Sequence, residues 1–323
     1  MTAAVPASPS PQHEVPAPVV DPEAPPNHRG RLVLISVVIG LLVTAAWSAP
    51  FVDKVIGENI ADTVVGHDAA GTSIAGGMAG LLFAFAAGLA GTFTACNIAA
   101  FSAIAPMMAG TERSTGSRLR LALRPIAWLS VGMVPVAVLY GAFGALLGDS
   151  LPQLSTDTVG SHNMPVRLLQ SIVVFGIIGL AFIWMGLAAL RLVPDPLARW
   201  TARWPQFPMV VMGVLIGLFL VGRPYPLFRK MFAYAAETGN PFYGALTFLL
   251  VAIGNIALMA ALFVVLTTTV GERFQRWLTA GTGRIAAVTG SALLVAGVFT
   301  FVYWDVRLLA RFDYGWFPTA PWA

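Results

Sequence analysis

Seven long stretches of this chain contain no charged residue, and these stretches constrain the fold more than any other feature. They lie at 32–52, 69–111, 125–148, 168–190, 204–222, within 238–271, and at 285–304. Each supplies the roughly 20 apolar residues that cross a hydrocarbon core about 30 Å thick. Charged residues make up 11% of the chain, against roughly 25% in soluble domains. The sequence therefore predicts an all-α integral membrane protein with about seven transmembrane helices, embedded in a lipid bilayer.

Arginine residues gather in alternate connections between these stretches. They are Arg29, Arg31, Arg113, Arg118, Arg120, Arg124, Arg191, Arg199, Arg203, Arg273, Arg276 and Arg284. The other connections hold most of the acidic residues between the spans. Cationic loops remain on the cytoplasmic side of a membrane. This pattern predicts a cytoplasmic N-terminus and an extracytoplasmic C-terminus.

The ends of the chain differ in composition from the apolar stretches. Residues 1–30 are rich in proline and alanine, which predicts a disordered cytoplasmic tail. Residues 31–53 form the first predicted transmembrane helix. Residues 311–323 are rich in aromatic side chains and are expected to lie on the outer surface as a short tail.

Cysteine and histidine usage excludes several kinds of site. Cys96 is the single cysteine, so neither an internal disulfide nor a cysteine-based metal cluster can form. The four histidines, His13, His28, His67 and His162, all lie outside the apolar stretches. We therefore expect no haem within the membrane, no metal site and no bound cofactor. A net charge of +4 gives no indication of nucleic-acid binding.

Two segments go beyond generic membrane sequence. The first, residues 77–101, has the sequence GMAGLLFAFAAGLAGTFTACNIAAF, and the second, residues 213–240, has the sequence GVLIGLFLVGRPYPLFRKMFAYAAETGN. They resemble the two reactive segments of the CcdA/DsbD transmembrane family, the thiol–disulfide carriers of cytochrome c biogenesis. In that family the first segment follows the pattern G-x(7)-P-C, with a small hydroxyl residue before the proline. Here Gly88, Thr94, Ala95 and Cys96 occupy those places.

The second family segment has the pattern G-W-T-P-C. Gly222, Arg223, Pro224, Tyr225 and Pro226 occupy these places here. The family transfers electrons through one cysteine in each segment, from cytoplasmic thioredoxin to an extracytoplasmic thioredoxin-like protein. Because proline or tyrosine replaces the second cysteine, this chain alone cannot store an electron pair as a disulfide.

The resemblance implies a fold for residues 73–310, with the helix at 31–53 as an addition. The family core is a six-helix inverted repeat of two three-helix halves (3+3). The first helix of each half would be interrupted, near 94–96 and near 223–224. Matched interruptions in an inverted repeat indicate a site near the membrane midplane. Together with the loop charges, the resemblance indicates the plasma (inner) membrane of a bacterium.

Cys96 is the candidate catalytic residue under this resemblance, and the alternative is that it is an inert buried side chain. Arg223 would either lie beside Cys96 and favour its thiolate, or extend toward the outer headgroups. The candidate site-lining residues are Thr94, Asn97, Gly91, Gly222, Arg223, Pro224, Tyr225 and Pro226.

Three functions remain open at the level of sequence. The first is a CcdA-like or DsbD-like protein of thiol–disulfide exchange, passing reducing equivalents or assisting assembly with a thioredoxin-like partner. The second is a LysE-type exporter on the same fold, with Arg223 contacting an anionic substrate. The third is a membrane scaffold without catalysis. No aspartate or glutamate lies inside any predicted span, which argues against proton-coupled transport.

Overall fold

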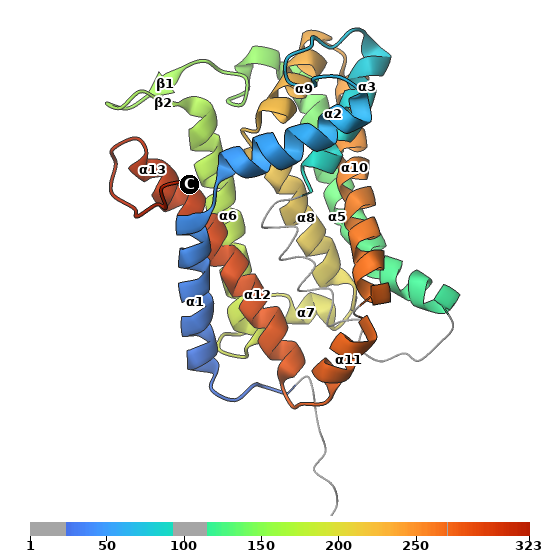
Figure 1. Ribbon diagram of the computed structural model, residues 1–323, viewed down its shortest axis with the longest axis vertical. Helices are drawn as coiled ribbons and strands as arrows, with labels where there is room; N and C mark the ends of the chain where they lie inside the picture. Colours follow the sequence, from blue (N-terminus) through green and yellow to red (C-terminus); the bar gives the residue numbers. More distant parts are fainter. Residues whose placement is uncertain (1–23, 93–114, 270) are drawn as a thin grey trace, which may run out of the picture.

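The computed structural model describes residues 24–92, 115–269 and 271–323, and these form an upright bundle of α-helices (Figure 1). Among the described residues, five helices are long and apolar enough to cross a membrane. A sixth span results if the bent pair α8 (Phe207–Gly222) and α9 (Pro226–Glu237) counts as one. The structure thus supports a multi-pass, all-α membrane protein with five to six spans in its described part.

The predicted stretch 69–111 is described only in its first part. Helix α3 (Gly77–Ala90) is apolar but has 14 residues, which at 1.5 Å per residue falls short of a hydrocarbon core about 30 Å thick. The structural description stops at residue 92 and resumes at 115. The seventh span and the inverted repeat therefore stay predictions.

The first helix, α1 (Arg29–Ala46), ends earlier than the predicted stretch 32–52. Trp47 is extended, and the chain then enters a π-helix, η1 (Phe51–Glu58), followed by α2 (Asn59–Val65). Pro50 immediately precedes η1, and proline favours a helix start because it lacks an N–H group. In Figure 1, η1 and α2 run across one end of the bundle instead of continuing α1.

The remaining long helices pack in an order that brings distant segments together. Helix α5 (Thr115–Leu147) lies against α8 and α10 (Pro241–Thr269), and α3 lies against α10. Helix α6 (Val166–Ala189) packs on α8 and on α12 (Arg284–Phe301), which also contacts α1. The shorter elements are η3 (Gly148–Ser150), β1 (Thr158–Val159), β2 (Met164–Pro165), α7 (Ala198–Thr201), α11 (Gly271–Thr279), η4 (Val302–Arg307) and α13 (Leu308–Ala310).

The last helix continues beyond Trp304, where the predicted span 285–304 ends. It runs through η4 and α13 as one candidate span to Ala310. The tail at 311–323 then folds back on the end of α1. The Ala320 N–H donates to the Ala45 carbonyl at 2.9 Å, and the Trp322 indole donates to the Ala46 carbonyl at 3.2 Å.

Arginine-rich connections lie together at one end of the bundle. The start of α1, α7 and α11 share this end in Figure 1, opposite η1, α2 and α9. Arg29 donates to the carbonyl of Arg191 at 3.0 Å, which joins two of these connections directly. The arrangement agrees with the charge asymmetry of the loops, whereas the assignment of this end to the cytoplasm remains a prediction.

Glycines allow the central helices to touch backbone to backbone. A Cβ added at Gly213 of α8 would collide with the Leu129 carbonyl of α5, and one added at Gly132 of α5 would collide with the Val210 carbonyl of α8. Helices in lipid gain no hydrophobic free energy when they associate. Close approach of their backbones stabilises the association instead, because it increases van der Waals contact.

We predict that Gly213→Ala separates α5 from α8 and lowers stability by about 1–3 kcal/mol, the usual cost of overpacking. Gly30→Ala is the matched control, because nothing lies within 4 Å of the added methyl group. The measurement is the thermal unfolding of both variants in the same detergent. Equal stability of the two variants would contradict the close packing described here.

Candidate functional site

The candidate site surrounds a break between α8 and α9. The two helices meet at 81°, and the three residues between them include Arg223 and Tyr225, both with extended backbone. Pro224 and Pro226 cause the break, because proline lacks an N–H donor and disfavours helical geometry in the residue before it. The interruption expected near Arg223 and Pro224 is therefore present.

The break frees the carbonyl groups of residues 221–223 from helical hydrogen bonding, and three side chains from other segments bind them. Gln170 donates to the Val221 carbonyl at 2.8 Å, and Ser171 donates to the Gly222 carbonyl at 2.6 Å. Gln153 donates to the Arg223 carbonyl at 2.7 Å. Ser171 and Gln153 are fully buried. Irregular backbone at membrane depth requires such internal partners, since lipid offers none.

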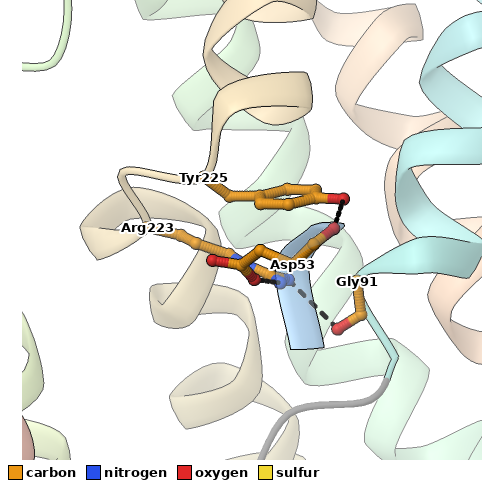
Figure 2. Close-up of polar contacts among 4 residues, drawn as sticks. All are labelled: Asp53, Gly91, Arg223 and Tyr225. Carbon is orange, nitrogen blue, oxygen red and sulfur yellow. Dashed lines mark hydrogen bonds and ion pairs between the residues drawn. The ribbon is translucent and has the colours of Figure 1, made fainter. Parts of the chain in front are cut away.

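The Arg223 side chain joins three separate segments (Figure 2). Its Nη2 lies 3.7 Å from Oδ1 of Asp53, which belongs to η1, and its Nη1 donates to the Gly91 carbonyl at 3.1 Å. The guanidinium carbon lies 4.6 Å from the ring centre of Tyr225, whose hydroxyl donates to the Asp53 carbonyl at 3.2 Å. Arg223 is thus held by contacts within the protein.

The ion pair between Arg223 and Asp53 is partly buried. The Arg223 side chain is 13% exposed and the Asp53 side chain 33%. Burial raises the pKa of the Asp53 carboxyl above its usual value, while the Arg223 charge and hydrogen bond oppose this shift. Arg223 therefore already has a carboxylate partner within the protein, which argues against the hypothesis that it binds an anionic substrate.

The residues expected to line a site fall into two groups. The structure gathers the following around the break: Gly91, Gly222, Arg223, Pro224, Tyr225 and Pro226. Glycine at position 91 allows Arg223 to approach the backbone closely, because a Cβ there would lie only 2.9 Å from Nη1 of Arg223. Cys96, Thr94 and Asn97 lie outside the described residues.

Asp53, Gln153, Gln170 and Ser171 were not singled out in the sequence. The sequence gives a weak indication that the two glutamines and the serine belong to a site, because polar side chains within or beside apolar spans commonly hydrogen-bond across helices. The sequence gives no such indication for Asp53, because this residue is one of several acidic residues in a connection between spans.

A cavity of about 370 Å³ adjoins the break. Arg223, Pro224 and Tyr225 form part of its wall, and the rest includes aromatic side chains from the residue after α1, from α6 and α8, and from the α12–η4 helix. Among the described residues, no three His, Cys, Asp or Glu side chains gather closely enough to hold a metal ion. The cavity is instead suited to a small organic ligand.

Comparison of the chain with protein-family models, with curated proteins and with solved structures found no match.

We predict that Ser171→Ala destabilises the protein by about 1–2 kcal/mol, because it leaves the Gly222 carbonyl unpaired. Ser130→Ala is the matched control, since the Ser130 hydroxyl donates to the Ile126 carbonyl one turn back in its own helix; a change within about 0.5 kcal/mol is expected there. Unfolding in detergent compares the two. A Ser171→Ala variant as stable as the control would show that the break does not depend on this bond.

Proposed function

We propose that this protein is a divergent CcdA-like membrane protein in which Cys96 exchanges thiol and disulfide with thioredoxin-like partners. The observation that carries the proposal is the hydrogen bond from Arg223 to the Gly91 carbonyl at 3.1 Å. It joins the two segments that resemble the reactive segments of that family. Cys96 follows Gly91 by five residues in the chain.

The packing of glycines supports the inverted repeat that this proposal requires. Under the resemblance, α3, α5 and α6 form the first half, and α8, α10 and α12 form the second. Between the halves, Gly88 of α3 abuts the Val251 carbonyl of α10, and Gly254 of α10 abuts the Phe85 carbonyl. Helix α8 of the second half and α5 of the first half meet in the same reciprocal way, through Gly213 and Gly132. The first helix of each half thus contacts the second helix of the other half. This is the pattern expected when a pseudo-twofold axis relates the two halves of an inverted repeat.

The proposed exchange needs no second cysteine in this chain. The Cys96 thiolate attacks the disulfide of an oxidised partner, which forms a mixed disulfide and releases one partner thiolate. A dithiol donor then displaces the reduced partner from Cys96, and its second thiol releases Cys96 as the donor closes its own disulfide. The electron pair passes from donor to acceptor, and a guanidinium near Cys96 would favour the attacking thiolate.

Acid-quenched thiol trapping in growing cells tests this proposal. We predict a heavier, reductant-sensitive species on a non-reducing gel that disappears in Cys96→Ser and decreases several-fold in Arg223→Gln. Gly30→Ala is the control, because it leaves both segments unchanged. A Cys96 thiol that stays monomeric, and that resists alkylation until the protein is denatured, would overturn the proposal and make Cys96 a packing residue.

A further inference from the structure

The cavity beside the break contains buried hydrogen-bond donors that the described residues leave without partners. Arg307 and Thr300 line it, and each is 1% exposed. Nη1 of Arg307 donates to the carbonyls of Thr44 and Trp47 at 2.7 and 2.8 Å. Within the described part of the chain, Nε and Nη2 of Arg307 and Oγ1 of Thr300 have no partner. Each atom has less than 1 Å² of accessible surface, so a ligand in the cavity reaches them through a small shift of the lining side chains. Unpaired polar groups at such a depth are costly, which indicates that a ligand can supply the missing bonds.

The charges around the cavity favour an anion. Its charged lining residues are Arg223, Arg307, Arg311 and Asp53, and Asp53 is already paired with Arg223. Asp305 is two residues before Arg307 but lies on another face, where its carboxylate approaches Gly176 of α6. Positive charge therefore exceeds negative charge on this wall.

The rest of the wall favours a flat apolar body. The aromatic lining residues are Trp47, Phe175, Phe219, Tyr225, Phe299, Tyr303, Trp304 and Phe312. Phe175 and Trp304 stack with ring centres 4.3 Å apart. Pockets with apolar walls and a few convergent polar groups are typical of small-molecule sites, and the volume lies within their usual range of about 300–1,000 Å³.

We propose that this cavity binds a monocarboxylate with a flat apolar body, and that Arg307 and Thr300 bind its carboxylate. The Nε and Nη2 of a guanidinium form a two-donor edge that matches the two carboxylate oxygens. The other bonds of Arg307 hold this edge in place, as does Tyr303, whose ring centre lies 5.2 Å from the guanidinium carbon. This site uses neither Cys96 nor thiol chemistry, so it stands independently of the proposed function.

Calorimetric titration of the purified full-length protein with 2-naphthoate tests the site. We expect saturable binding of one 2-naphthoate per chain, and at least tenfold weaker binding of the neutral 2-naphthamide. Equal binding of both compounds, or uptake without saturation, would overturn the proposal. Tighter binding of decanoate than of 2-naphthoate would overturn the flat apolar body and would make a membrane fatty acid the ligand.

Variants must separate binding from folding, because Arg307 also holds the end of α1. Thr300→Val removes a hydroxyl that has no partner in the described chain, so this variant should fold and should bind 2-naphthoate about fivefold more weakly, which corresponds to the loss of one hydrogen bond. Thr268→Val is the control, since Thr268 is exposed on α10 and bonds within its own helix. Unchanged affinity in a folded Thr300→Val variant, or an equal loss in the control, would contradict the assignment.

Discussion

The break between α8 and α9 places three free backbone carbonyls and one guanidinium inside an apolar bundle. Lipid cannot hydrogen-bond any of these groups, so the protein must do so itself. Helix α6 supplies Gln170 and Ser171, the segment after η3 supplies Gln153, and η1 supplies Asp53. The positions of these segments are thus coupled to a single irregular point in one helix.

Glycine packing makes this convergence possible. The backbone contacts of α3 with α10, and of α8 with α5, remove the space that side chains would otherwise occupy. The Gly91 carbonyl is then close enough to accept a hydrogen bond from Arg223. In a bundle with bulkier contacts, Arg223 would lose that partner, and a charge within a span would be much less favourable.

Hydropathy was sufficient to predict the five to six spans that the described residues form, and proline chemistry accounts for the break, because both depend on the local sequence. Pro224 and Pro226 disrupt helical geometry wherever they occur. The pairing of Asp53 with Arg223 was not predictable, because the two residues stand 170 positions apart in the sequence and nothing near Asp53 distinguishes it from other acidic residues. The turn of η1 and α2 across the bundle, which creates this pair, was missed for the same reason.

The last helix shows how charge can mislead a prediction from hydropathy. Asp305 and Arg307 follow Trp304 and indicated the end of the predicted span. The helix continues because carbonyls at the end of α1 accept hydrogen bonds from Arg307, which makes its burial tolerable. Whether a charged residue ends a span depends on whether another segment offers it a hydrogen-bond partner. The local sequence of the last helix does not show this, because the partners of Arg307 lie at the end of α1.

Arg223 depends on Asp53 for its place inside the bundle, and a double-mutant cycle tests this dependence most directly. Unfolding free energies are measured in one detergent for the wild type, Asp53→Asn, Arg223→Gln and the double variant. The structure predicts a coupling energy of at least about 0.5 kcal/mol, as found for residues in direct contact. Strictly additive effects would contradict the account, because they would show that the two side chains do not interact in the folded protein.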